Sequence, residues 1–258
     1  MEQMKLPKEL MKESQVCSYE DELQKQTDNF NKSQGDLNKR DGIDCEICNN
    51  KGVIRSIVEG YPINKDCSCM IKRRSVIYAK QSGLGKLLDY KLENFKTAEP
   101  FQKAMLTKAL EFIKSDKGWF VALGQSGSGK TMLCSAIARC LIGKCKRTMY
   151  IVYPTWIREV RMLLNDGGSI ASWQKVEVLY IDDLFKGRTP SENDINICYE
   201  LLNHRYNNAL TTIISSEMLF SQLMNIDEAI AGRIKEMCEV IIEIHKDENK
   251  NFRLGEKQ

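Results

Sequence analysis

The sequence contains no long hydrophobic run, although 42% of its 258 residues are hydrophobic. No apolar stretch approaches the roughly 18 residues that a membrane-spanning helix needs, and none follows the polar first residues. We therefore expect a cytoplasmic protein with no secretory signal and no membrane partner. The hydrophobic fraction is still large enough for a folded core, and the length suits one α/β domain with a smaller module.

A strong excess of one charge is also missing. The formal net charge at pH 7 is +3, which is too small by itself to indicate a nucleic-acid-binding protein. Any basic surface must therefore be local. No internal repeat is visible along the chain.

One stretch of the sequence matches the pattern G-x-x-x-x-G-K-[ST] of a phosphate-binding loop. Its residues are Gly124, Gln125, Ser126, Gly127, Ser128, Gly129, Lys130 and Thr131. Glycines let the backbone curl so that N–H groups point at anionic oxygens, and the helix that follows adds its positive end. We predict that Lys130 binds the β- and γ-phosphates of ATP and that the Thr131 hydroxyl binds Mg²⁺. A chance Gly-Ser turn is the alternative, but residues 119–123 indicate a buried strand before the loop and residues 132–142 an apolar helix after it.

An acidic pair ends a second apolar strand, at Asp182 and Asp183. In NTPases with such a loop, the first aspartate helps to hold Mg²⁺, and a second carboxylate can activate the attacking water. We therefore predict that Asp182 binds magnesium and that Asp183 is the catalytic base. The alternative, a strand that merely ends in an acidic turn, is weakened by the phosphate-binding loop that precedes it.

Apolar β-rich runs alternate with helical patterns in the second half of the chain, which favours a parallel sheet with helices on both faces. The expected strands cover residues 120–123, 148–153, 176–181, 211–215 and 240–244. The expected helices cover residues 101–113, 131–142, 156–165, 192–206 and 230–238. We expect an N-terminal arm at 1–40, a cysteine module at 41–80, a linker at 81–100 and an ATPase domain at 101–258. The arm is either a partly disordered tail or a helical segment that orders on a partner.

Cysteine is abundant: the chain has ten, of which Cys45, Cys48, Cys67 and Cys69 are clustered. A disulfide-rich secreted scaffold does not fit a chain with a nucleotide loop and no signal peptide. Four cysteines in two pairs predict a structural zinc site, although the second pair is CxC rather than CxxC. An iron–sulfur cluster and free buried thiols remain as alternatives. The six scattered cysteines are expected to be small core residues.

A basic stretch at 71–74 follows the cysteines, with Tyr78 close behind. It could contact single-stranded DNA through phosphates and base stacking, or it could be a solvated helix face. Further along, the polar end of the 211–216 strand would lie beside the γ-phosphate. Arg233 could reach the phosphate of a neighbouring subunit, or it could be an ordinary surface arginine.

In combination, four motifs resemble the AAA+ ATPases of the DnaC/DnaI type, the replicative helicase loaders of bacteria and their phages. They are GQSGSGKT at 124–131, LYIDDLFKG at 179–187, TTIISSE at 211–217 and AGRIKEMCEV at 231–240. The cysteine module and the closing residues 251–254 also match, so the resemblance covers roughly residues 42–254.

The resemblance implies an AAA+ αβα core with a five-stranded parallel sheet in the order 5-1-4-3-2. It implies ATP hydrolysis coupled to delivery of a DnaB-type ring helicase to single-stranded DNA, with the helicase contact in the N-terminal half. It further implies that Arg233 acts in trans within a homo-oligomer in the ATP state. The phage or mobile-element variety of the family is the expected one.

One position departs from the family pattern. Many relatives carry asparagine where this chain has Glu217, and a carboxylate there would repel the γ-phosphate unless it points elsewhere. We expect Ser216 to supply the polar contact to the nucleotide instead, or sensing to be weak. Tyr90 and Phe95, upstream of the core, are candidates for the adenine pocket.

Two other functions remain open. A transposition helper ATPase of the IstB type has nearly the same core but a transposase as its partner, and that family usually lacks four clustered cysteines. A nucleotide-gated DNA-binding switch with little turnover is the second, because Glu217 could weaken hydrolysis.

Overall fold

The computed structural model describes residues 8–187, 189–238 and 241–247. The expected strand ending at 251–254 and the last two residues of the 231–240 motif lie outside these ranges. Contacts divide the chain into two units between Val76 and Ile77, and each unit is described by itself.

The first unit is built on a helix and a β-hairpin. Its elements are α1 (Lys8–Lys32), α2 (Leu37–Asp41), β1 (Val53–Val58), β2 (Tyr61–Asp66) and the first half of α3 (Cys69–Gln81). The two strands are antiparallel, and Val58 faces Tyr61 across the turn. Glu59 and Gly60 both have positive φ, 52° and 78°, which is the backbone of a two-residue hairpin turn. No strand was predicted at residues 53–66, so this hairpin is an addition to the expected elements.

The C-terminal end of α1 packs on the hairpin. The Asn31 side chain donates a hydrogen bond to the backbone oxygen of Arg55 at 2.8 Å and accepts one from its N–H at 2.9 Å. The Arg55 guanidinium lies 3.8 Å from the centroid of the Phe30 ring, a cation–π contact. These contacts join the end of the arm to the cysteine module.

The second unit contains the larger sheet and its helices. Its short 3₁₀ turns are η1 (Gly85–Asp89) and η2 (Leu92–Asn94), and its strands are β3 (Trp119–Gly124), β4 (Thr148–Val152), β5 (Val178–Asp182), β6 (Thr211–Ser216) and β7 (Ile241–Ile244). Its helices after α3 are α4 (Pro100–Ser115), α5 (Lys130–Gly143), α6 (Tyr153–Asn165), α7 (Ala171–Lys175), α8 (Glu192–Asn207), α9 (Phe220–Ile226) and α10 (Glu228–Met237).

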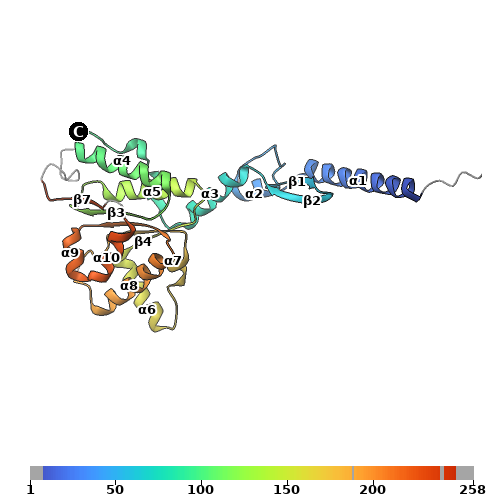
Figure 1. Ribbon diagram of the computed structural model, residues 1–258. Coiled ribbons are helices and arrows are strands. Elements are labelled where there is room, and N and C mark those ends of the chain that lie inside the picture. The colour runs from blue at the N-terminus through green and yellow to red at the C-terminus, as the bar shows by residue number, and fades with distance from the viewer. Residues whose placement is uncertain (1–7, 188, 239–240, 248–258) are drawn as a thin grey trace, which may run out of the picture. The chain divides into compact units, whose positions relative to one another are not determined.

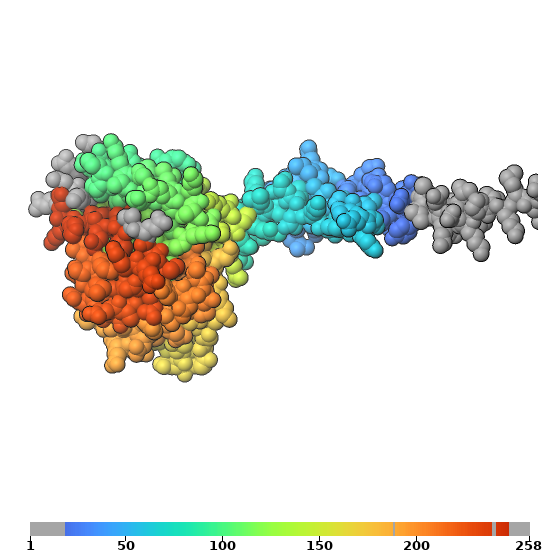
Figure 2. Space-filling model, in the orientation of Figure 1, coloured from blue at the N-terminus to red at the C-terminus, as the bar shows by residue number. Residues whose placement is uncertain are grey.

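The five strands form one parallel sheet in the spatial order β4-β5-β6-β3-β7. Numbered from the first strand of this unit, that is the predicted order 5-1-4-3-2, so the expected αβα core is confirmed. Figure 1 shows α4 and α5 on one face of the sheet and α6, α8 and α10 on the other. Two buried clusters fill these two interfaces. On the surface in Figure 2, the green α4 region and the orange α8–α9 region accordingly lie on opposite sides of this unit.

Most predicted elements are present, with shifted ends. β5 extends to Asp182, so the first aspartate is the last strand residue. α6 begins at Tyr153, earlier than predicted. Pro154 occupies its first turn, where proline loses no intrahelical hydrogen bond because N–H groups there have no helical acceptor. Of the scattered cysteines, Cys134, Cys198 and Cys238 are core residues as expected, whereas Cys140 and Cys145 are partly exposed.

A buried arginine fixes the starts of two central strands. Arg205 on α8 is fully buried and donates to the carbonyl oxygens of Trp173, Val176 and Thr211, and to the Thr212 hydroxyl. These bonds satisfy its guanidinium and join the segment before β5 to the start of β6. Because these bonds fix where β5 and β6 begin, they also help to position the carboxyl ends of the two strands, at the acidic pair and Glu217.

Candidate nucleotide site and cysteine cluster

The phosphate-binding loop leaves β3 and enters α5 through glycines with left-handed backbone. Gly124, Gly127 and Gly129 have φ values of 101°, 76° and 93°. A Cβ atom on Gly124 would lie 2.1 Å from the backbone oxygen of Ile244 on β7, so no other residue fits there. The Gln125 N–H donates to that same oxygen at 2.9 Å. The loop is therefore held in shape by the neighbouring strand.

Lys130 lies inside the loop with its ammonium on backbone oxygens. Nζ donates to the carbonyl oxygens of Gly124 at 2.7 Å and Gln125 at 2.6 Å. The side chain is buried, and burial lowers its pKa although nearby carboxylates, Glu217 first, act in the opposite direction. An anion in the loop would offer this ammonium stronger acceptors than neutral carbonyls.

The carboxylate of Asp182 meets the loop at Thr131. Thr131 Oγ1 donates to Asp182 Oδ1 at 3.3 Å, the Ser215 hydroxyl donates to the same oxygen, and Tyr150 Oη donates to Oδ2 at 3.1 Å. A hydroxyl and a carboxylate side by side are oxygen ligands of the kind that Mg²⁺ prefers, so these residues fit the ion. The sequence did not point to Tyr150, which lies outside the quoted motifs, or to Ser215, which lies in TTIISSE beside the residue that was singled out, Ser216.

Asp183 adopts a left-handed backbone, with φ at 57°. Its N–H donates to Ser215 Oγ at 3.2 Å, and its Oδ2 lies 3.2 Å from Lys186 Nζ. Burial and the charge of Asp182 raise the pKa of the Asp183 carboxyl, and Lys186 counteracts the rise. A half-buried carboxylate with a raised pKa is suited to accept a proton.

One pocket of the second unit joins these groups. It is lined by Tyr90, Ser126, Gly127, Gly129, Lys130, Thr131, Met132, Asp183, Lys186 and Glu217. Glu217 Oε1 lies 2.9 Å from Lys186 Nζ. Burial acts to raise the pKa of Glu217, but hydrogen bonds with Lys186 and Ser126 outweigh it and lower the pKa, so this carboxylate is charged.

Ser216 is not brought to the pocket. It is fully buried, donates to the carbonyl oxygen of Leu184 at 2.7 Å and accepts from the N–H of Met218 at 3.1 Å. Its hydroxyl is thus occupied within the fold, and the expected nucleotide contact has no free group to make it. Glu217, the next residue, lines the pocket in its place.

The two candidate adenine residues differ in their positions. Tyr90 is partly exposed and lines the pocket. Phe95 is buried, and its ring lies where a Cβ atom on Gly129 would meet it at 3.2 Å. Phe95 therefore packs under the phosphate-binding loop, and Tyr90 is the aromatic ring that faces the pocket.

Arg233 lies on α10 and does not line the pocket. Its guanidinium donates to the Asn203 side chain at 2.9 Å, to the Ala229 carbonyl at 2.9 Å and to the Tyr199 hydroxyl at 2.8 Å. It also lies 4.6 Å from the centroid of the Tyr199 ring. In the single chain, Arg233 thus joins α10 to α8.

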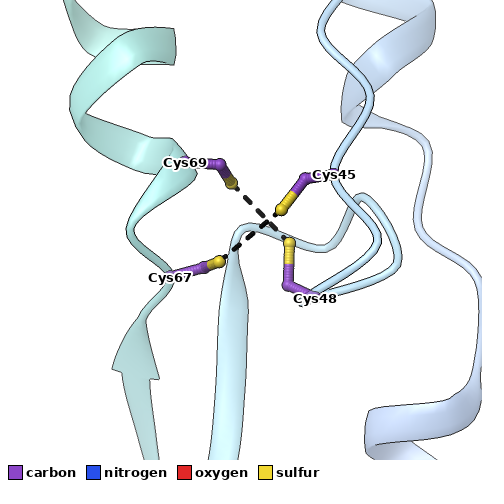
Figure 3. A group of neighbouring side chains, drawn as sticks. All are labelled: Cys45, Cys48, Cys67 and Cys69. Atoms are coloured by element: carbon purple, nitrogen blue, oxygen red, sulfur yellow. Dashed lines mark hydrogen bonds between the residues drawn. The ribbon is translucent and has the colours of Figure 1, made fainter.

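Four cysteine sulfurs of the first unit converge on one point (Figure 3). Cys45 and Cys48 come from the loop before β1, Cys67 follows β2, and Cys69 begins α3. The Sγ–Sγ distances are 3.8 Å for Cys45–Cys67 and 3.7 Å for Cys48–Cys69, and all four sulfurs lie within 4.8 Å of one another. A tetrahedral zinc with bonds near 2.3 Å separates its sulfurs by about 3.8 Å, so the cluster fits one such ion.

A buried arginine supports the cysteine cluster. Arg73 Nε lies 3.4 Å from Cys69 Sγ, and Nη1 lies 2.6 Å from both carboxylate oxygens of Asp41. Nη2 donates to the Ile43 carbonyl and to the side-chain oxygen of Asn50, which also accepts from the Cys45 N–H. A positive charge beside a thiolate stabilises its anionic form.

These contacts correct the prediction for the basic stretch. Arg73 is buried against Asp41 and cannot reach DNA phosphates. Arg74 is exposed and pairs with Asp66 at 2.5 Å, and Tyr78 is partly buried against the core cluster of the second unit. Lys72 and Arg74 remain exposed, so a DNA contact at 71–74 stays a prediction that rests on these two residues.

The chain is similar to known proteins along most of its length. It is 30% identical over 213 residues to the phage-like element PBSX protein XkdC of Bacillus subtilis, a match that covers 76% of this chain and 79% of XkdC. It is 26% identical over 227 residues to the replicative helicase loader DnaI of the same organism, covering 74% and 73%. In fold it resembles the crystal structure of the DnaC helicase loader, with a TM-score of 0.57, 20% identity and coverage of 62% of this chain and 98% of DnaC.

A family match agrees with these similarities. The family described as IstB-like ATP binding protein matches residues 72–257, which contain the sheet, the phosphate-binding loop and the acidic pair but not the four cysteines. The resemblance to DnaC/DnaI-type AAA+ proteins is thereby confirmed. Among the described residues, no helix is both long and apolar enough to cross a bilayer. The chain belongs to the IstB-like ATP-binding protein family.

Proposed function

We propose that this protein is an ATP-hydrolysing helicase loader that delivers a DnaB-type ring helicase to single-stranded DNA. The observation that carries the ATPase proposal is the hydrogen bond from Thr131 to Asp182, beside a pocket that Lys130 and Asp183 both line. The similarity to DnaI and to the DnaC fold supports the loader over other ATPases.

The residues divide the chemistry of hydrolysis among them. Lys130 and the N–H groups of the glycine loop bind the phosphates, and Thr131 with Asp182 holds Mg²⁺, which neutralises phosphate charge when bound. Asp183 accepts the proton of the attacking water as the γ-phosphoryl group leaves ADP. Arg233 of a neighbouring subunit completes the site in an oligomer, and to do so it exchanges Tyr199 and Asn203 for phosphate oxygens.

The first test replaces the loop lysine. Lys130→Ala should weaken ATP binding by about 100-fold or more, equivalent to about 2.7 kcal/mol, because the only buried ammonium of the loop is lost. Calorimetric titration with ATP and a phosphate-release assay measure the two effects. Lys175→Ala, an exposed lysine at the end of α7, is the matched control and should behave as the wild type. Normal hydrolysis by Lys130→Ala would overturn the site.

We also propose that the four cysteines hold one structural zinc ion. A module with a two-stranded hairpin has little core, so metal binding supplies much of its folding free energy. All four cysteines serve as ligands, which leaves no open position for catalysis. The Arg73 guanidinium, whose Nε lies 3.4 Å from Cys69 Sγ, stabilises part of the negative charge that four thiolates bring to zinc, and Asp41 holds that guanidinium in place.

Metal analysis of the purified protein tests the zinc site. We expect about one zinc ion per chain, lost in the double variant Cys45→Ser with Cys48→Ser, because two sulfurs cannot complete a tetrahedral shell. Cys140→Ser, a cysteine of α5 outside the cluster, should retain the metal. An unchanged zinc content in the double variant would refute the assignment, and iron in place of zinc would support the iron–sulfur alternative.

Contact with single-stranded DNA is proposed for the ATPase unit as well. Arg158 and Arg161 on α6 line a second pocket together with Lys186. Arg158 is exposed, whereas Arg161 pairs with Asp194 in the same pocket. An exposed guanidinium such as that of Arg158 attracts the phosphates of a nucleic acid, so Arg158 is the residue of this pocket that we propose to contact DNA.

The family description keeps one rival open, a transposition helper of the IstB type. Partner capture separates the two: the full chain, immobilised with ATP, is offered a purified DnaB-type helicase and a purified transposase in parallel. We expect retention of the helicase, and no retention by the chain when the cysteine pair is removed, since the N-terminal unit carries the contact. Retention of the transposase alone would favour the helper. Tight ATP binding without turnover would favour the nucleotide-gated switch.

A further inference from the structure

The nucleotide pocket contains two carboxylates where an anionic ligand is expected. Asp183 and Glu217 both line it, and like charges at close range repel strongly where water is partly excluded. Lys130 does not neutralise them directly, since its ammonium donates to loop carbonyls. Another cation must therefore balance the pocket.

Lys186 lies between the two carboxylates. Its Nζ is 3.2 Å from Asp183 Oδ2 and 2.9 Å from Glu217 Oε1, so it bridges the end of β5 and the end of β6. The two lysines and two carboxylates of the pocket sum to zero charge, and removal of Lys186 leaves a net negative lining. The residue stands in the LYIDDLFKG motif, to which the sequence analysis gave no role beyond the aspartates.

A strained turn places Lys186. Asp183, Phe185 and Gly187 have φ values of 57°, 57° and 105°, and the Lys186 N–H donates to the Asp183 carbonyl at 3.1 Å. A left-handed phenylalanine is unfavourable, and it persists here because its buried ring packs edge-on against Tyr153 at 5.1 Å between centroids. The turn therefore returns the lysine side chain towards the pocket.

We propose that Lys186 is a positioning residue of the nucleotide pocket: it holds Asp183 and Glu217 and balances their charge, so that the pocket accepts a nucleoside triphosphate. The proposal rests on the proposed function, because it concerns the same ATP site. It also explains how a glutamate is tolerated at position 217. A triphosphate carries more negative charge than a diphosphate. The net charge of the pocket lining therefore affects the binding of ATP more than the binding of ADP.

The experiment compares ATP and ADP affinities of the full chain by calorimetric titration. Lys186→Met should weaken ATP binding by about tenfold, equivalent to about 1.4 kcal/mol, and ADP binding by much less. Lys186→Arg keeps the charge and should bind both nucleotides nearly as the wild type does. Adding Glu217→Gln to Lys186→Met removes the excess negative charge and should restore most of the ATP affinity.

Rescue of ATP affinity by Lys186→Arg, and by Glu217→Gln in the Lys186→Met background, is a readout that a merely structural lysine would not give, because both changes restore the charge balance rather than a packing contact.

The outcomes separate this proposal from the ATPase proposal. If the wild type binds ATP, Lys130→Ala does not, and Lys186→Met binds ATP and ADP like the wild type, Lys186 has no such role. Equal weakening of ATP and ADP, or no rescue by Glu217→Gln, also overturns it. If the wild type itself binds no ATP, the proposed function fails first. Thermal unfolding of each variant shows whether the fold is intact.

Discussion

The contact between Thr131 and Asp182 is the constraint on which the rest of the site depends. It joins the start of α5 to the end of β5, although β6 lies between β3 and β5 in the sheet. This meeting requires the strand order to place all three carboxyl ends at one edge, as open parallel sheets do at their ligand-binding crevice. Ser215 on the intervening strand contacts both Asp182 and Asp183, so each of the three strands contributes to the site.

Each unit places a cation directly beside carboxylates or thiols at its candidate site. In the first unit, Arg73 is fully enclosed and meets Asp41, a cysteine sulfur and two neutral oxygens. In the second, Lys186 is shared between Asp183 and Glu217. An opposite charge close by favours the ionised form of each group, whereas an isolated charge in a buried site would tend to become neutral. Although the net charge of the chain is small, charged groups are therefore concentrated at a few sites.

Much of this architecture could be predicted from local sequence. The alternation of apolar runs predicted the parallel sheet, and the loop glycines and the aspartate pair predicted the nucleotide site, because each is a short-range pattern. The order of the strands was implied only by the family resemblance. The roles of Tyr150, Ser215 and Lys186 could not be predicted, since they depend on which strand ends become neighbours. The same reason explains Ser216: nothing local shows that Leu184 and Met218 would occupy its hydroxyl. A DNA contact by Arg73 was considered from the basic stretch because the sequence does not reveal that Arg73 is buried against Asp41.

Loading of a helicase by this protein is the most direct test of the proposed function. Unwinding of a forked DNA, with its single-stranded arm coated by a single-strand-binding protein, is measured with a purified DnaB-type helicase and this protein. We predict that unwinding begins only when the wild-type chain and ATP are both present, and that Lys130→Ala gives none. Unwinding that proceeds equally with Lys130→Ala, or that the wild type with ATP fails to promote, would contradict it.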